Sequence, residues 1–424
     1  MRIARLKLAN VRAIEAMEFG FRPGFNLVAG VNGVGKTTVL EALAVCLSAI
    51  VGRAVGVRRG GASFGVDDIR MGVGALQVEC GFELGGELET YTLHRPRESV
   101  FVPEEMDEFY RQETGQSANT APTIEEFYPG MPVEGEIRTS HSQPLAVLFS
   151  TNRAIPSERA PPKSAAAGGV SPAYSGALSN RRGLHLAEFG TWMRAQEALS
   201  SERPAAKRML SAFETAVTRF LPDYRNFRVG DDGKGGSPLL VDRGATTLPV
   251  RVLSDGERGV LALVLDLTRR LAQANPEMDD PAAEAGAVVL IDEIELHLHP
   301  SWQRRIVGNL AETFPQCQFV ATTHSPQVIG EVEHDRIHII ADGEVDSPFY
   351  SYGVDSNRIL EEIMDAPPRT ARVKELLSTI SRAIEDDRYE YARNLLSDLS
   401  GRLGEEDPEV TRIRTLLDFM MDDA

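Results

Sequence analysis

Alternating apolar and polar residues predict β-structure at the start of the chain. The first such stretch covers residues 2–8, and a second strand is expected over 16–21. A two-residue period is typical of strands that bury one face. The alternation returns over 76–95 on both sides of Gly85-Gly86, which predicts a hairpin. We expect these strands to form one antiparallel sheet.

Continuous apolar runs, in contrast, predict strands that are buried on both faces. Runs of this kind cover 25–29, 145–149, 287–291 and 318–323. Such strands are typical of a mostly parallel sheet that is covered by helices. Helical periodicity is found over 39–47, 184–199, 204–221 and 260–271. The chain is therefore predicted to be an α/β protein.

Two segments give shorter signals. Thr123 followed by Glu126 matches a capping box, which predicts the start of a short helix. Residues 154–180 are rich in Pro, Ala, Gly and Ser and have little apolar periodicity, so we predict a mobile loop there. The two helical segments that follow, 184–199 and 204–221, are interpreted as a lid.

The last part of the chain differs in character. A short helix is expected after residue 352, and three amphipathic helices follow, the last of them preceded by Asp407-Pro408. We divide the chain into a head over 1–345, with an insertion over about 96–222, and a helical region over 346–424. This helical region is either a cap on the head or a docking surface for a partner.

Composition narrows the classes of function. The 424 residues include 45 basic and 62 acidic side chains, a formal net charge of −17. This charge argues against a free-standing nucleic-acid binder, because phosphate contacts need Lys and Arg; a local basic groove or a basic partner remains compatible with it. The cysteines Cys46, Cys80 and Cys317 lack metal-ligand spacing and are expected to be reduced. No segment is expected to span a membrane, and a cytoplasmic protein is predicted.

The main chemical signal is a glycine-rich loop at residues 30–38. Its sequence, GVNGVGKTT, fits G-x-x-x-x-G-K-[ST] and lies between a predicted strand and a predicted helix. Glycines let backbone N–H groups surround a phosphate, Lys36 is expected to contact the β- and γ-phosphates, and the Thr37 hydroxyl is expected to bind Mg²⁺. The other predicted nucleotide contacts in this loop are Asn32, Gly33, Gly35 and Thr38.

Two carboxylates follow the apolar run 287–291. Ligands of open α/β sheets bind beyond the C-terminal ends of the strands. Asp292 is therefore expected to hold the Mg²⁺ shell, and Glu293 to orient or deprotonate the attacking water. His324 follows the run 318–323, where it could reach a γ-phosphate oxygen.

Ser254 begins a third candidate segment, Ser254-Asp-Gly256-Glu257, before a strongly apolar helix. Ser254 and Glu257 match a capping box. A Ser-x-Gly helix start also exposes N–H groups and a hydroxyl that can bind the γ-phosphate presented by another subunit. The structural and the functional interpretation are compatible here.

Two further motifs suggest different chemistry. His297 and His299 alternate as in some zinc sites, but the sequence offers no further ligands, and a subunit-contact loop leading to Pro300 at a helix start is the better account. Pro222-Asp223 with Asp232-Gly233-Lys234 matches the P-D…D-x-K pattern of many nucleases. These carboxylates flank a predicted hairpin turn, so we favour a turn over a nuclease site.

Taken together, these segments resemble the full motif set of an ABC-type ATPase. The motifs are Walker A at 30–38, signature at 253–257, Walker B at 291–293, D-loop at 295–300 and switch histidine at His324. The start of the chain is similar to the SMC, Rad50, RecF and OLD branch (AAA_21-like), in which Arg12 would match an arginine that contacts the nucleotide. A solvated turn residue is the alternative for Arg12. The signature reads Ser-Asp-Gly rather than Ser-Gly-Gly, and no clear Q-loop glutamine follows 145–149.

The block 352–364 and the helical tail resemble the PtuA-like ATPase subunit of Septu antiphage systems, which is also found in some retron operons. The resemblance implies an ABC-type head, ATP and Mg²⁺ as cofactors, and ATP hydrolysis without intrinsic nuclease activity. It also implies a homo-oligomer in which Lys36 of one head and Ser254 of another bind the same ATP, and a separate HNH nuclease. A RecF-like repair ATPase that acts directly on DNA, and a nucleotide-holding scaffold with slow turnover, remain as alternatives.

Overall fold

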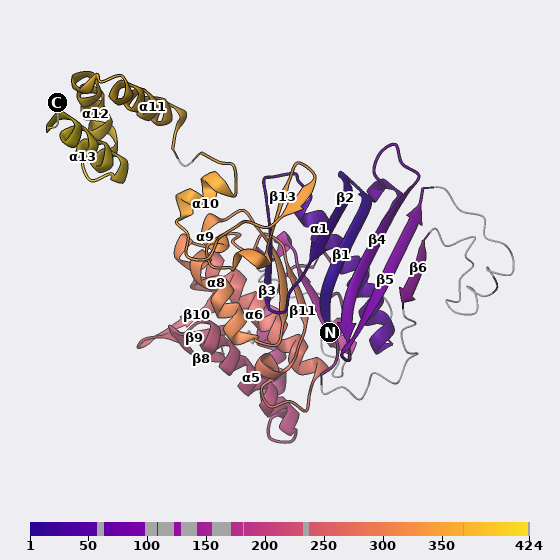
Figure 1. Cartoon of the computed structure of the whole chain (residues 1–424). Coiled ribbons are helices and arrows are strands. Elements are labelled where there is room, and N and C mark those ends of the chain that lie inside the picture. The colour runs from indigo at the N-terminus through magenta and orange to yellow at the C-terminus, as the bar shows by residue number, and fades with distance from the viewer. Residues whose placement is uncertain are drawn as a thin grey trace. The chain divides into compact units, whose positions relative to one another are not determined.

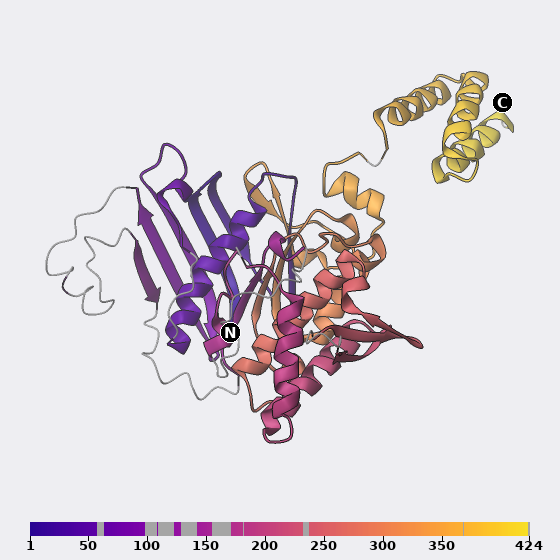
Figure 2. The same cartoon turned by 180° about the vertical axis from the view of Figure 1, so that it is seen from behind.

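The chain divides into two compact units, Met1–Ser356 and Asn357–Ala424. The computed structural model describes residues 1–56, 63–97, 108, 123–128, 142–154, 171–180, 182–231, 237–367 and 369–422. Figures 1 and 2 show the chain from opposite sides.

A six-stranded sheet forms the centre of the first unit (Figure 1). Its strand order is β14-β13-β3-β12-β11-β7, and every neighbouring pair is parallel except β13 and β14. The predicted, mostly parallel sheet is therefore confirmed. The four strands that the apolar runs form, β3, β7, β11 and β12, are fully buried, as their composition requires. The strands are β3 (Phe25–Ala29), β7 (Ala146–Phe149), β11 (Val288–Ile291), β12 (Gln318–Thr323), β13 (Ile337–Ala341) and β14 (Glu344–Asp346).

A second, antiparallel sheet has the order β2-β1-β4-β5-β6. The hairpin predicted at Gly85-Gly86 is confirmed, since β4 and β5 pair on both sides of it. The helix predicted at Thr123 is wrong: this segment is strand β6, which pairs with β5. The edge of β5 offers backbone partners to an extended segment, and such tertiary pairing overrides a capping signal this short. The strands are β1 (Arg2–Val11), β2 (Ile14–Gly20), β4 (Ala75–Leu84), β5 (Glu87–Pro96) and β6 (Ile124–Tyr128).

Helix α1 (Lys36–Val55) packs between the two sheets (Figure 2). It contacts β7, β11 and β12 of the central sheet and β4 and β5 of the antiparallel sheet. By length and composition this helix could cross a membrane, which contradicts the prediction that no segment could. However, 72% of its most apolar window is buried inside the protein. Its position between two sheets therefore accounts for its apolar composition.

A helical layer containing α5, α6 and α8 completes the first unit. Helix α5 packs against α4, α6 and α8, so the two segments interpreted as a lid belong to the packed body of this unit. A small antiparallel sheet, β10-β9-β8, lies next to them in sequence. The helices are α4 (Leu186–Leu199), α5 (Pro204–Phe220), α6 (Asp255–Ala274), α7 (Pro281–Glu284), α8 (Pro300–Thr313) and α9 (Pro326–Ile329), and the strands are β8 (Tyr224–Val229), β9 (Leu239–Arg243) and β10 (Thr246–Pro249). Helix α10 (Ser356–Glu362) begins with the last residue of the first unit and otherwise belongs to the second.

The predicted mobile loop 154–180 is ordered in its last part. Residues 155–170 lie outside the described residues. Residues 171–180 include the short helix α3 (Ser171–Tyr174), and Ala173 is fully buried. The prediction was wrong there because Arg270, which is distant in sequence, binds the backbone carbonyls of Ala173 and Ser175.

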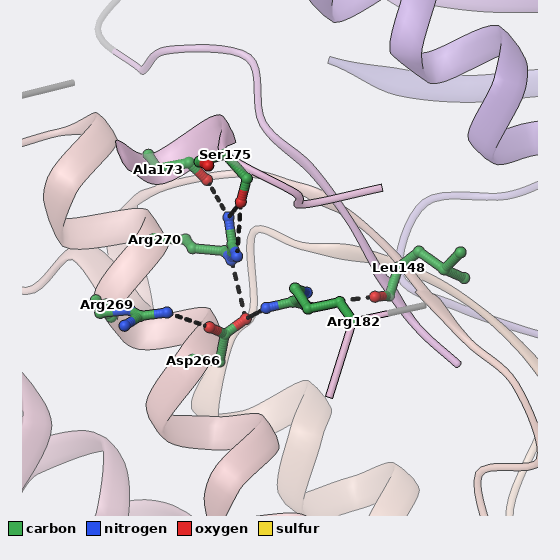
Figure 3. Close-up of polar contacts among 7 residues, drawn as sticks. All are labelled: Leu148, Ala173, Ser175, Arg182, Asp266, Arg269 and Arg270. Atoms are coloured by element: carbon green, nitrogen blue, oxygen red, sulfur yellow. Dashed lines mark hydrogen bonds and ion pairs between the residues drawn. The ribbon is translucent and has the colours of Figure 1, made fainter. Parts of the chain in front are cut away.

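Arg270 belongs to a group of charged side chains that we call the Asp266 cluster: Asp266, Arg182, Arg269 and Arg270 (Figure 3). Asp266 is 1% exposed and pairs with all three guanidinium groups, at 2.7 Å from Arg269 and 2.9 Å from Arg270. Burial alone would raise the pKa of Asp266, but attraction to the three arginines holds that pKa well below its usual range. The cluster also donates to the backbone carbonyls of Leu148, Ala173 and Ser175, so it ties α6 to β7 and to the end of α3.

The second unit contains three helices around its own apolar core. The predicted helices are confirmed as α11 (Ala371–Glu385), α12 (Tyr389–Leu403) and α13 (Pro408–Asp422). Asp407 caps α13 by accepting from the backbone N–H of Glu409 at 3.0 Å, and it also binds Arg369. The core residues are Ile380, Ala383, Ala392, Leu396, Leu399, Val410, Ile413 and Leu417.

Candidate active site

The glycine-rich loop connects β3 to α1 in the predicted strand-loop-helix order. Gly30, Gly33 and Gly35 all have positive φ, at 147°, 86° and 104°. At Gly30 a side chain would also come within 2.6 Å of the Ile340 carbonyl oxygen. The loop can therefore keep this shape only with glycine at these positions. Asn32 and Gly33 are exposed at its tip.

Lys36 is buried and folds back along the loop. Its ammonium donates to the carbonyl oxygens of Gly30 at 2.9 Å and Val31 at 2.8 Å. Burial lowers the pKa of Lys36, and the nearby carboxylates, Glu293 foremost, oppose that shift. The ammonium thus lies beside both the loop and the carboxylates at the end of β11.

Thr37 and Asp292 meet as the sequence predicted for a metal site. The Thr37 hydroxyl lies 3.2 Å from each carboxylate oxygen of Asp292, and Thr322 donates to Asp292 Oδ1 at 2.7 Å. Hydroxyl and carboxylate oxygens are the ligands that Mg²⁺ prefers. This pair of residues fits the expected Mg²⁺.

Glu293 adopts an unusual backbone conformation next to Asp292. Its φ is +47°, in the left-handed region that costs a non-glycine residue roughly 1–2 kcal/mol. Its N–H donates to Thr322 Oγ1 at 2.7 Å, and its carbonyl accepts from Arg153 at 2.6 Å. These contacts hold the turn that follows β11.

His324 follows β12 and lies near the same carboxylates. Its N–H donates to Glu295, which also accepts from Thr323 Oγ1 at 2.8 Å. Burial lowers the pKa of His324 and the positive charge of Lys36 lowers it further, while Glu295, Glu293 and Asp292 act in the opposite direction. The lowered pKa favours a neutral imidazole at pH 7.

Arg12 lies against the first turns of α1. Its guanidinium pairs with Asp68 at 2.7 Å and with Glu41, and donates to Thr38 Oγ1 at 3.4 Å. Burial alone would lower the pKa of Arg12, but the hydrogen bonds to Asp68 and Glu41 raise it. Arg12 is therefore a fixed cation beside the phosphate loop rather than a freely solvated turn residue.

Ser254 caps α6 in the predicted capping box. Its side chain accepts from the Glu257 N–H at 3.3 Å and donates to the Glu257 carboxylate at 2.7 Å, and Tyr224 donates to the same carboxylate. A side chain on Gly256 would come within 2.6 Å of the His297 carbonyl oxygen, so the D-loop packs directly on the signature. Within the described residues, the side-chain hydrogen bonds of Ser254 all go to Glu257. Unlike Asp292, which accepts from Thr37, Ser254 has no side-chain hydrogen bond to the phosphate loop of its own chain among the residues that the structure describes.

Of the two histidines with zinc-like alternation, His299 contacts the backbone. His299 caps α8, since its Nδ1 accepts from the Ser301 N–H at 3.3 Å. The described residues contain no group of three or more His, Cys, Asp or Glu arranged to hold a metal ion. The three cysteines are free and buried. Of the nuclease-like pattern, residues 232–236 lie outside the described residues.

Two residues of this site were not predicted from the sequence. Glu295, known only as the start of the D-loop, fixes the backbone at His324. Arg153, which lies in the segment after 145–149, holds the Asp292–Glu293 turn. A cation placed after a buried strand that neighbours β11 was the available signal for Arg153.

The sequence and the fold are similar to those of known ATPases. Residues 155–330 match a family described as "AAA domain, putative AbiEii toxin, Type IV TA system", and residues 5–141 match another described as "AAA domain". A crystal structure of an SMC head bound to the C-winged helix domain of ScpA covers 82% of this chain and 98% of that chain, with a TM-score of 0.50 and 15% identity. The predicted ABC-type head fold is thereby confirmed.

Two curated relatives carry the resemblance to defence proteins. The Retron Ec83 probable ATPase of Escherichia coli is 35% identical over 225 residues, which cover 52% of this chain and 41% of that protein. The match thus spans less than half of the retron relative. The Septu protein PtuA of Bacillus thuringiensis is 20% identical over 402 residues, which cover 92% of this chain and 90% of that protein. The predicted similarity to both groups is confirmed.

Proposed function

We propose that this P-loop ATPase, which has an SMC-type head, is the regulatory subunit of a prokaryotic antiphage defence complex. The observation that carries the proposal is the similarity to PtuA along 92% of the chain, a share too large to be confined to the head. A cytoplasmic location and the absence of a membrane partner belong to the same proposal.

In the proposed reaction, the chain's own residues hold ATP and direct a water molecule to it. Lys36 and the loop N–H groups contact the phosphates, and Arg12 lies where it can add a further cation. Thr37 and Asp292 would hold Mg²⁺, which neutralises charge on the β- and γ-phosphates. Glu293 orients or deprotonates the water, and neutral His324 contacts a γ-phosphate oxygen.

A second copy of the chain would complete each site. The exposed hydroxyl of Ser254 lies at the start of a 20-residue helix, with Gly256 buried in the first turn; an anion is favoured at such a helix start. Within the described residues, the side-chain hydrogen bonds of Ser254 do not reach its own phosphate loop. We therefore propose that Ser254 contacts the γ-phosphate held by the partner head. ATP binding would then favour head pairing, because each nucleotide contacts both chains.

The proposed output of head pairing is control of a separate nuclease. The HNH class of this partner is an expectation from the resemblance to PtuA-like subunits, and the second unit is the proposed docking surface. Contact with DNA, where it occurs, would be made through the complex, in keeping with the net charge of −17.

The test is the mass of the purified protein in solution, alone and with its genomic neighbours co-expressed, with and without Mg·ATP. Lys36→Ala removes the phosphate contact, and Glu293→Gln slows hydrolysis while ATP still binds. We expect a stable complex with a nuclease, and an ATP-dependent increase in head pairing that Glu293→Gln prolongs and Lys36→Ala abolishes.

Two outcomes would contradict the proposal. A protein that stays alone and gains ATPase activity when DNA is added would favour the RecF-like alternative. Unchanged turnover and unchanged dimer lifetime in Glu293→Gln would favour the nucleotide-holding scaffold.

A further inference from the structure

Arg153 is a buried cation whose contacts are unusual for a buried arginine. It lies in the short 3₁₀ helix Thr151–Ala154 that follows β7, and it is 6% exposed. Its hydrogen bonds within the described residues all go to backbone carbonyl oxygens: those of Phe149, Ser150, Asp292 and Glu293. A buried charge that lacks a directly bonded counterion is costly, so a stabilising role elsewhere in the site is expected of it.

The register of the central sheet brings Arg153 to the catalytic segment. β7 and β11 are parallel, with Phe149 opposite Ile291. The residues after each strand therefore leave the sheet side by side. Nη1 of Arg153 reaches the carbonyl of Asp292, and Nη2 reaches the carbonyl of Glu293 at 2.6 Å. One guanidinium thus spans two successive carbonyl groups of the segment that bears both predicted catalytic carboxylates.

This two-pronged contact matters because the segment is strained. Glu293, whose carbonyl is one of the two that Arg153 binds, has the left-handed conformation, at φ +47°. That conformation is disfavoured by roughly 1–2 kcal/mol for a residue with a side chain. The fixed fork of an arginine can offset this cost, whereas a lysine offers a single point charge.

The loop that carries Arg153 is itself fixed. Ser150 Oγ and Asn152 Nδ2 both donate to the Asn180 carbonyl at 2.8 Å. Asn180 Nδ2 in turn donates to Glu41 on α1 at 3.1 Å, and Glu41 pairs with Arg12. Hydrogen bonds through Asn180 and Glu41 therefore connect the loop that carries Arg153 to helix α1.

We propose that Arg153 is a positioning residue for hydrolysis, which sets the Asp292–Glu293 backbone so that the Glu293 carboxylate faces the attacking water. This inference rests on the proposed role of Glu293. It predicts that loss of the fork misplaces Glu293, while ATP binding through Lys36 and the phosphate loop is preserved.

The experiment compares Arg153→Lys, Arg153→Gln, Glu293→Gln and the double variant Arg153→Lys/Glu293→Gln. Steady-state turnover gives kcat, and titration with a fluorescent ATP analogue gives Kd. Arg208→Lys is the matched control, because Arg208 also donates to a carbonyl, that of Pro276 at 2.9 Å, but outside the site. Thermal melting confirms that each variant is folded, and Arg153→Lys keeps a cation in place should Arg153→Gln fail to fold.

We expect kcat of Arg153→Lys to fall on the order of 10- to 100-fold, as for a misplaced catalytic group, with Kd within about threefold of wild type. The double variant should be no slower than Glu293→Gln, because Arg153 acts through Glu293. Wild-type turnover in Arg153→Lys, a parallel rise in Kd, or losses that multiply in the double variant would each overturn the inference. Wild-type turnover in Glu293→Gln would instead contradict the proposed function.

Discussion

Strand β7 contacts two arginine sites that differ in the groups bonded to the guanidinium. At the Asp266 cluster, three guanidinium groups surround one carboxylate, and Arg182 also donates to Leu148 and lies over the Phe149 ring. At Arg153, one guanidinium binds only carbonyl oxygens within the described residues. Burial lowers the pKa of Arg153 to about 10, and the carboxylates of Asp292, Glu295 and Glu293 oppose that shift without being bonded to it.

The difference in bonding indicates what the arginines contribute at each of the two sites. In the Asp266 cluster each arginine is bonded directly to the Asp266 carboxylate, so the expected contribution of the cluster is to the stability of the joint between α6 and β7. Arg153 binds the backbone carbonyls of Asp292 and Glu293 rather than their carboxylates, which stay available to Mg²⁺ and water. The expected contribution of Arg153 is therefore to catalysis. The two sites should therefore respond differently to the same kinds of substitution.

The largest expected effect is on stability at the Asp266 cluster. Asp266→Asn removes the carboxylate bonded to Arg270, which is 3% exposed. Breaking a buried ion pair by removing one partner costs about 3–5 kcal/mol. Denaturant unfolding should show this loss. Asp242→Asn is the control: Asp242 pairs with Arg228 at 3.0 Å near the surface, and its loss should cost far less. Equal losses at the two positions would show that burial does not set the contribution of the cluster.

A buried base that has no carboxylate partner among the described residues extends the comparison. His338 is 7% exposed, its ring lies 5.4 Å from that of Phe21, and burial lowers its pKa to about 4. The unfolded chain, with a histidine pKa near about 6.5, binds a proton that the folded chain excludes. Stability should therefore fall as the pH decreases from 6.5 towards 4, by up to about 3 kcal/mol.

The measurement is the free energy of unfolding between pH 4 and 7, in wild type and in His338→Gln. The variant should lose much of the pH dependence in this window. An identical pH dependence in both proteins would mean that other groups cause it.

A smaller effect on stability is expected at Arg153. Arg153→Met takes away the donor of the Asp292 carbonyl, while the Glu293 carbonyl still accepts from the Leu296 N–H at 2.9 Å. An unsatisfied buried carbonyl costs about 1–3 kcal/mol, but the variant also removes a buried cation, which offsets part of that cost. We expect a loss of at most about 2 kcal/mol in unfolding experiments, together with a large loss of turnover. A loss of stability as large as that of Asp266→Asn would place Arg153 among the structural arginines.

The residues of the active site that follow local rules were predictable from the sequence. Gly30, Gly33 and Gly35 are needed for positive φ, Asp292 follows a fully apolar strand, and Ser254 precedes an apolar helix with Glu257 three residues later. Each signal lies within a few residues of the structure that it specifies. The hairpin at Gly85-Gly86 was predictable for the same reason.

Long-range partners were not predictable. Arg153 bonds to a residue 139 positions away, and Arg182 to one 84 positions away. No local period marks such pairs, and the Arg153 contact exists because β7 and β11 are neighbours in the sheet. Strand β6 was missed for a related reason: only the edge of β5 makes its five residues extended.

The smallest expected effect comes from exchanging arginine for lysine at the Asp266 cluster, and it tests the comparison most directly. Arg182→Lys keeps a cation next to Asp266 but loses the second prong to the Leu148 carbonyl, a weak contact at 3.4 Å. For Asp266, a nearby positive charge matters more than the two-pronged shape of a guanidinium group. We therefore expect the free energy of unfolding to fall by only about 0.5–1 kcal/mol, and turnover to stay near normal. The same exchange at Arg153 keeps the charge but loses the fork that spans two carbonyls, and should reduce turnover with little change in stability. The measurements are the free energy of unfolding and kcat of both lysine variants. A loss of turnover in Arg182→Lys but not in Arg153→Lys would mean that charge matters at the Asp292–Glu293 turn and that geometry matters at the Asp266 cluster.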